Sequence, residues 1–144
     1  MPVLLPLDAS DQDIIEAVHT WVKLLEKEYY EEAFQFTYQD PYYEWTPDLM
    51  REVIYGYGFP ESDAEIEVYK VTSMQDASTD DVASPYAEVS YHMPRKHRIE
   101  NVLTVAEVWF SLPLNGKWSD VTATFNVLYM PSAVSLELQE IHVF

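Results

Sequence analysis

The fold class of this chain is decided by one stretch, Asn101–Met130, which reads NVLTVAEVWFSLPLNGKWSDVTATFNVLYM. Two runs rich in Val, Thr and Phe flank Asn115-Gly116, the strongest short-range signal for a two-residue β-hairpin. We therefore predict antiparallel strands over residues 101–113 and 117–130. From Val121 to Tyr129 every second residue is apolar, which places one face of the sheet against a core.

Strands are also predicted on both sides of this hairpin. Residues 64–73 and 86–94 are rich in Val and Tyr, and the polar residues 74–85 between them predict a mobile hairpin loop. A turn is predicted over residues 94–98. In the last strand, the apolar phase slips between Leu138 and Ile141, so we predict a β-bulge near Gln139-Glu140 that bends the sheet.

The N-terminal third has helical periodicity. Ser10 and Asp13 have the spacing of a capping box, and apolar residues then recur at helical spacing, which predicts a helix over residues 10–27. Residues 29–36 predict a second helix or a bent continuation of the first. Thr46-Pro47 is typical of a helix start, and this third helix is expected to end at Gly56-Tyr57-Gly58.

Helices followed by strands are typical of an α+β fold. We expect N-terminal helices packed on the concave face of a curved antiparallel sheet of four to five strands. The length of 144 residues, with 48% hydrophobic and 15% aromatic residues, is sufficient for one core, so residues 1–144 are expected to form one domain.

The charge balance narrows the class of partner. Eight Lys and Arg stand against 25 Asp and Glu, which gives a net charge of −17. Such a charge repels phosphates and anionic lipids, so nucleic acid and membrane surfaces are not expected as partners. Basic proteins and neutral ligands remain as candidate partners.

The chain lacks the residues that several kinds of chemistry require. The chain has no cysteine, which excludes disulfide frameworks and thiolate chemistry, and its three glycines form no phosphate-binding loop, so we expect no cofactor. The apolar start Met1–Leu7 has no basic flank and is shorter than a signal-peptide core, and no stretch approaches the ~20 apolar residues of a membrane span. A cytoplasmic location is the expectation.

Histidines offer no clear metal site. His92 and His97 flank the turn after residue 93, and Glu88 lies on the same strand face as His92, but this spacing matches no established ligand pattern. We expect no metal and a solvated histidine at position 92.

The order of elements, the Tyr-Glu-Glu-Ala segment at residues 30–33 and the Gln39-Asp40-Pro41 step resemble the nuclear transport factor 2-like superfamily of cystatin-like α+β cones. The resemblance implies either a cone interior that binds or converts a small molecule, or a filled cone whose outer sheet binds proteins. Its catalytic branch is ketosteroid-isomerase-like and SnoaL-like. There, a strand that ends in Asp-Pro supplies a general base, a first-helix Tyr stabilises an oxyanion, and a strand Asp assists.

That resemblance implies candidate site residues in this chain. Asp40 matches the general base, Asp120 the assisting acid, and Trp21 stands where the helical Tyr is expected. From the residues alone, an Asp before Pro more often forms a turn than acts as a base. Asp120, beside the hairpin, is more often a polar turn residue than an acid catalyst. An aromatic pocket for a small apolar ligand is expected from the following residues, for which core packing is the alternative: Trp21, Tyr30, Tyr43, Trp45 and Tyr57.

An acidic set suggests a second class of function. It comprises Glu61, Asp63, Glu65, Glu67, Asp76, Asp80, Asp81 and Glu88. An acidic, aromatic-rich surface steers a basic protein, as in an inhibitor or an immunity protein.

We therefore expect a non-enzymatic binding protein. The alternative is a SnoaL-like isomerase or lyase that uses Asp40 as its base. A homodimer with sheets packed back to back through residues such as Trp109, Leu128 and Met130 is compatible with both.

Overall fold

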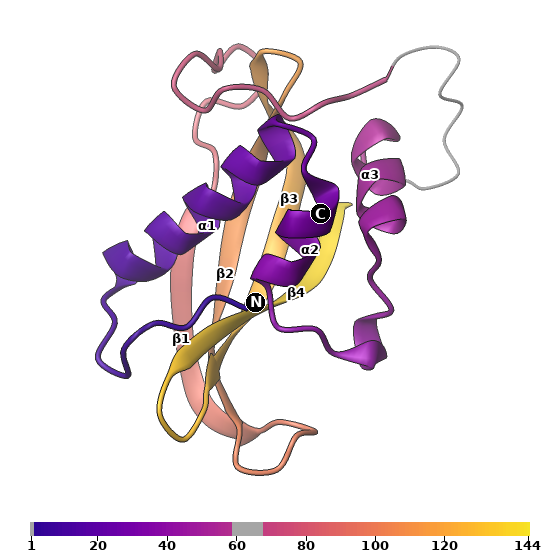
Figure 1. Ribbon diagram of the computed structural model, residues 1–144. Coiled ribbons are helices and arrows are strands. Elements are labelled where there is room, and N and C mark those ends of the chain that lie inside the picture. The colour runs from indigo at the N-terminus through magenta and orange to yellow at the C-terminus, as the bar shows by residue number, and fades with distance from the viewer. Residues whose placement is uncertain (1, 59–67) are drawn as a thin grey trace.

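The computed structural model describes residues 2–58 and 68–144 (Figure 1). Helices α1 (Asp11–Glu26), α2 (Tyr30–Phe36) and α3 (Pro47–Tyr55) come first, with a 3-10 turn η1 (Pro41–Tyr43) before α3. Strands β1 (Ala87–Lys96), β2 (Leu103–Leu114), β3 (Lys117–Tyr129) and β4 (Val134–Val143) follow, and they form an antiparallel sheet in the order β1-β2-β3-β4. The expected α+β class is confirmed.

Local signals set the ends of the helices. The Ser10 hydroxyl accepts a hydrogen bond from the Asp13 N–H at 3.1 Å, and the Asp13 carboxylate accepts one from the Ser10 N–H at 3.0 Å, so the predicted capping box is formed. Glu28 has a φ of 60°, which breaks the helical path and makes α2 a separate helix. The Thr46 hydroxyl caps α3 by accepting from the Leu49 N–H at 3.0 Å.

The predicted hairpin connects β2 and β3. Asn115 and Gly116 have φ values of 50° and 84°, and two consecutive positive φ values are typical of a type I′ turn. The twist of such a turn matches that of the strands it joins. This hairpin forms the centre of the sheet.

The predicted bulge in β4 decides which side chains share a face. Thr124 of β3 pairs with Glu140, and the next residue, Phe125, pairs with Leu138, so Gln139 is the extra residue. The bulge turns Glu137 and Glu140 to the same face, which strict alternation would not allow. We call this the outer face.

The inner face of the sheet, which carries Phe125, packs against the helices. Trp21 of α1 is fully buried and meets Phe125 edge-on, with ring centroids 5.0 Å apart. Leu138 and Ile141 are also buried on this face. Figure 1 shows α1 and α2 lying across one side of the sheet and α3 beside β4. The core therefore lies between the helices and one face of the sheet.

Two expectations about the middle of the chain are wrong. Residues 68–73 form no strand, and Val71 makes only an isolated bridge to Leu114, because this segment crosses the end of the β2–β3 hairpin instead of pairing along it. Residues 64–67 lie outside the described residues. Because residues 68–73 form no strand, residues 74–85 do not join two strands in the described part of the chain. Ser78 is held at the hairpin, where its N–H donates to the Gly116 carbonyl at 2.9 Å.

The structure also differs from the expectations drawn from the sequence at the edge strand and on the outer face. β1 continues through Pro94 to Lys96, past the expected end at residue 94, because an edge strand tolerates a missing N–H. Leu128, expected at a dimer interface, is fully buried within the chain. None of the helices in residues 2–58 and 68–144 has the length and apolar character needed to cross a membrane.

Candidate functional site

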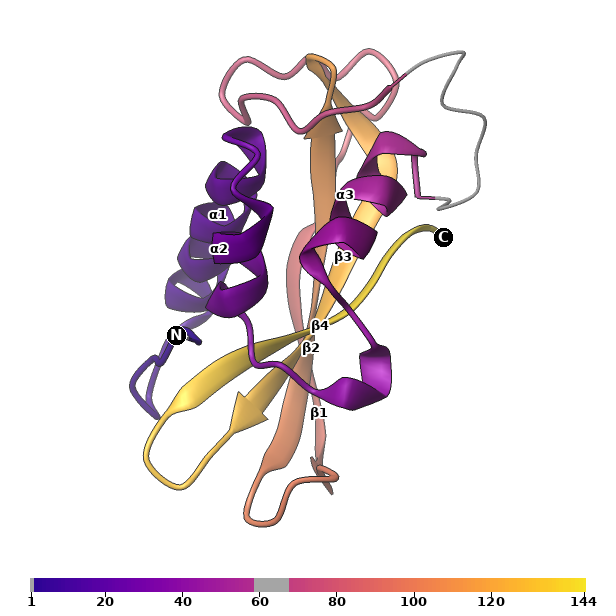
Figure 2. The same ribbon diagram turned by 45° about the vertical axis from the view of Figure 1, so that its right-hand side comes forward.

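Four charged or titratable side chains from distant segments meet at the edge of the outer face. They are Asp40, His97, Arg98 and Glu137, and we call them the ion cluster. The chain leaves α2, crosses β4 and turns at η1, as Figure 2 shows. The Tyr38 N–H donates to the Leu136 carbonyl at 2.6 Å, which holds this crossing against β4. His97 and Arg98 come from the turn after β1.

The cluster is buried except for its arginine. The side chains of Glu137, His97 and Asp40 are 1%, 2% and 6% exposed, and that of Arg98 is 43% exposed. The His97 Nε2 atom lies 2.9 Å from the Glu137 Oε2 atom and 3.4 Å from the Asp40 Oδ2 atom. Arg98 donates to the same Asp40 oxygen through both Nε and Nη2.

Further bonds complete the network. The Tyr42 N–H donates to the Asp40 carboxylate at 2.9 Å, so Asp40 also caps η1. The Asn126 amide donates to the Glu137 Oε1 atom at 2.9 Å. The Arg98 guanidinium stacks over the Tyr42 ring at 4.1 Å. Each buried carboxylate therefore accepts at least two hydrogen bonds, as buried charges require.

The pKa values of the two buried carboxyl groups, Asp40 and Glu137, are shifted in opposite directions. Burial raises the pKa of Asp40, but hydrogen bonds from the Tyr42 N–H and from Arg98 outweigh it and hold that pKa below its usual value. Burial raises the pKa of Glu137 above its usual value despite the bonds from Asn126 and His97. A carboxylate with a lowered pKa is a weak base, so this arrangement favours a structural role for Asp40.

Asp40, His97 and Glu137 also offer three potential metal-ligand atoms within 4.8 Å of one another. The Ile99 N–H donates to the His97 Nδ1 atom at 3.1 Å, so the proton of the neutral ring resides on Nε2. That proton occupies the lone pair a metal would need, and Arg98 already binds the Asp40 oxygen. The donor set therefore fits an internal ion network better than a metal centre.

A pocket of about 300 Å³ adjoins the cluster, and we call it the η1 pocket. Asp40, Tyr43 and Trp45, three of the residues predicted for a site, line it together with Tyr38 and Leu138. The Trp45 indole N–H donates to the carbonyl of the bulged residue, Gln139, at 2.9 Å. Trp45 thus satisfies a carbonyl at the bulge and forms a pocket wall.

The other predicted site residues lie elsewhere. Trp21 and Tyr30 are in the hydrophobic core, and neither the Trp21 indole N–H nor the Tyr30 hydroxyl has a hydrogen-bond partner among the described residues. Tyr57 lies near the hairpin turn, where its hydroxyl accepts from the Asp120 N–H at 3.3 Å. Asp120 is exposed beside that turn. The structure thus separates these residues from Asp40.

The outer face carries a second candidate site between β2, β3 and β4. Trp109 contacts Phe144 and Tyr86, with ring centroids 4.7 Å and 5.6 Å apart. A groove of about 180 Å³ lies here, walled by Tyr43, Trp109 and Phe144 and containing Glu107, Glu140 and Thr124. We call it the outer-face groove. Neither Glu107 nor Glu140 has an ion-pair partner among residues 2–58 and 68–144.

Sequence reasoning missed most of these residues. His97 was paired with His92 and Glu88 as a possible ligand, but in the structure His97 contacts Glu137, and the His92 ring lies 2.8 Å from the Met93 carbonyl. The signal for Glu137 is a carboxylate between two leucines, Leu136 and Leu138, in the last predicted strand. Among the acidic set, residues 61–67 lie outside the described residues.

No family model matches the chain, and no curated protein and no solved structure is significantly similar to it. The function must therefore be argued from the geometry of the ion cluster, the η1 pocket and the outer-face groove.

Proposed function

We propose that the chain is a non-enzymatic binding protein of the nuclear transport factor 2-like fold, whose acidic, aromatic-rich outer face takes a basic protein partner. An inhibitor or immunity protein is one version of this role. The observation that carries the proposal is the outer-face groove, in which aromatic side chains surround two carboxylates without ion-pair partners in the described chain.

The charge of the whole chain supports a basic partner. A net charge of −17 attracts cationic proteins over a distance of about 8 Å at physiological salt, and this attraction raises the association rate. Tyr86 and Phe144 are 44% and 58% exposed, and exposed aromatic residues are enriched at protein interfaces. Charge thus favours encounter, and the aromatic residues supply area to bury.

The proposal is tested by selecting random peptides displayed on phage against the immobilised protein. We expect the selected peptides to be enriched in Arg and Lys relative to the starting library. Their affinity should fall for the double variant Glu107→Gln/Glu140→Gln. The matched control, Glu31→Gln/Glu32→Gln on α2, removes the same charge from the helical side and should bind as the wild type does.

Three results would overturn the proposal. In the first, the selected peptides are not basic. In the second, both double variants weaken binding equally, so that only the net charge matters. In the third, light scattering finds a wild-type dimer and a monomeric Glu107→Gln/Glu140→Gln variant, so that the outer face joins two copies of this chain.

A second candidate is the SnoaL-like isomerase or lyase with Asp40 as its base. It is favoured by one observation: Asp40 lines the η1 pocket and lies 3.4 Å from the His97 Nε2 atom. The lowered pKa of Asp40 and its bonds to Arg98 count against it. Asp40→Asn separates the two candidates, since a binding protein keeps its affinity for the selected peptides and a base-dependent enzyme loses most of its turnover.

A further inference from the structure

We infer that the outer-face groove is an arginine-binding subsite, which receives the guanidinium of one arginine side chain presented by the basic partner. This inference rests on the proposed function and specifies the chemistry of the same surface.

The strand register places the two carboxylates on either side of the groove. Glu107 of β2 lies opposite Asn126 of β3, and Glu140 of β4 lies opposite Thr124 of β3. Adjacent strands are about 4.8 Å apart, so β2 and β4 are roughly 10 Å apart with β3 between them. A cation above β3 is therefore flanked by a carboxylate on each side.

The aromatic walls favour arginine over lysine. A guanidinium is planar, stacks on aromatic rings and forms bidentate bonds with carboxylates, whereas an ammonium is a compact and strongly hydrated charge. The same combination of stacking and carboxylate binding occurs once within the chain, where the Arg98 guanidinium stacks on Tyr42 while it binds Asp40. Tyr43, Trp109 and Phe144 offer comparable surfaces at the groove.

The floor of the groove provides an independent indication of a polar ligand. Thr124 is 3% exposed and lines the groove, and its hydroxyl forms no hydrogen bond with another described residue. This hydroxyl is left to solvent or to a ligand in the groove, and a guanidinium N–H is a suitable donor to it.

The size of the groove suits a side chain. Its volume of about 180 Å³ is below the ~300–1,000 Å³ typical of pockets for whole small molecules.

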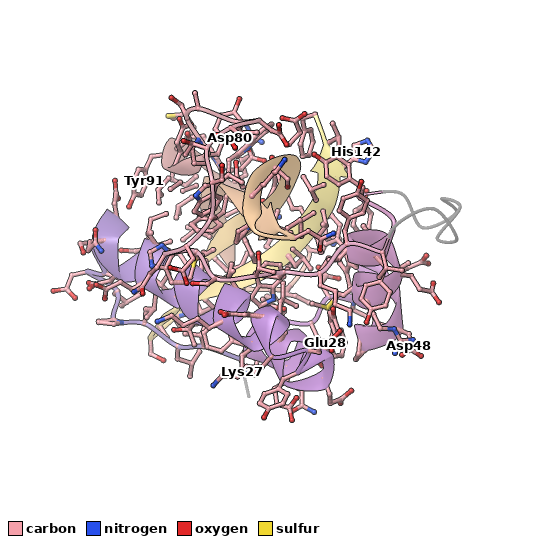
Figure 3. The ribbon with its side chains drawn as sticks, turned by 90° about the horizontal axis from the view of Figure 1, so that it is seen from above. Lys27, Glu28, Asp48, Asp80, Tyr91 and His142 are labelled. Atoms are coloured by element: carbon pink, nitrogen blue, oxygen red, sulfur yellow. The ribbon has the colours of Figure 1, made fainter. Side chains whose placement is uncertain are left out.

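The basic side chains that form ion pairs within the described chain do not occupy the outer-face groove. The described basic side chains in ion pairs are bound elsewhere: Arg51 to Asp48, Lys70 to Glu28, Arg98 to the ion cluster and Lys117 to Asp81. A second copy of the chain would bring another net charge of −17 to the same face. Figure 3, seen from above, shows Lys27, Glu28 and Asp48 on the side of the helices and Asp80 and His142 on the other side of the molecule.

The test is a titration of the ¹⁵N-labelled protein with the capped tripeptide Gly-Arg-Gly, followed through the indole N–H signal of Trp109 at low ionic strength. Trp109→Phe assigns that signal. Gly-citrulline-Gly has the same shape without the charge and serves as the control peptide, and Gly-Lys-Gly tests the preference for a guanidinium.

We expect Gly-Arg-Gly to shift the Trp109 signal in a saturable manner, Gly-Lys-Gly to bind more weakly, and Gly-citrulline-Gly to leave the signal unchanged. Glu140→Gln and Glu107→Gln should each weaken binding by roughly threefold to fivefold, the upper range for one exposed ion pair. Glu32→Gln on α2 should not change it.

The inference is overturned if citrulline and arginine peptides shift the signal alike, if lysine binds as well as arginine, or if Glu32→Gln weakens binding as much as Glu140→Gln. Such a result leaves the proposed function standing when displayed basic peptides still depend on Glu107 and Glu140. If the display selection yields no basic peptides, the proposed function itself has failed.

Discussion

Replacing Glu137 by Gln tests whether the ion cluster stabilises the fold. Glu137 is 1% exposed and accepts two hydrogen bonds, one from the Asn126 amide and one from the His97 Nε2 atom, both at 2.9 Å. A glutamine has the same shape but only one acceptor oxygen. Whichever way the glutamine amide is oriented, its NH₂ group faces one of the two hydrogen-bond donors. One buried hydrogen bond is therefore lost.

The expected loss follows from this count. An unsatisfied buried donor costs about 1–3 kcal/mol, so Glu137→Gln should lower the free energy of unfolding by that amount. His97 cannot relieve the conflict by moving its proton to Nδ1, because Nδ1 accepts from the Ile99 N–H. The assay is urea unfolding followed by tryptophan fluorescence at neutral pH.

A matched control lies on the same strand. Glu140→Gln makes the same chemical change at an exposed position, and we expect it to stay within about 0.5 kcal/mol of the wild type. A loss equal to that of Glu140→Gln refutes the reasoning.

Three further predictions concern single residues. Asp40→Asn should destabilise the fold at neutral pH, and its deficit should disappear as the pH falls below about 4, because a lowered pKa contributes stability only while the group is ionised; a deficit that persists in acid would contradict this. Gly116→Ala should lower stability by about 1–2 kcal/mol in thermal unfolding, because the φ of 84° is strained for any residue with a Cβ, although that atom would meet nothing within 4 Å; an unchanged midpoint would count against the turn. Trp21→Phe should cost less than about 1.5 kcal/mol by urea unfolding, since the buried N–H that it removes along with ring area has no partner among the described residues; a loss of the ~3–5 kcal/mol typical of Trp→Ala would contradict this.

Short-range signals predicted most of the fold. The capping box at Ser10, the Thr46-Pro47 start and the Asn115-Gly116 turn each act within a few residues, so their effect does not depend on the rest of the chain. The bulge at Gln139 was also visible, because the phase slip of the apolar residues records which face each side chain must occupy. The predicted strand over residues 64–73 was wrong in its described part, since β-propensity measures packing against neighbours that the sequence does not show.

The candidate sites were predicted only in part. Asp40 was singled out by its Asp-Pro step, and the structure places it both as the cap of η1 and in the wall of the η1 pocket. Trp21 and Tyr30 were named for a pocket and lie in the core, since an aromatic stripe at helical spacing is the same for either purpose. Glu107 and Glu140 carry no local signal at all.

By itself, then, the sequence determined the three helices, the central hairpin, the bulge and the strongly negative charge, because each of these depends on neighbouring residues or on composition. Only the tertiary structure decided which charges meet. Asp40 and Arg98 are 58 positions apart, and His97 and Glu137 are 40 apart. Their contacts depend on how the crossing before η1 packs on β4 and on the register of four strands. Those long-range pairings are set by burial of the whole core, which no local pattern encodes.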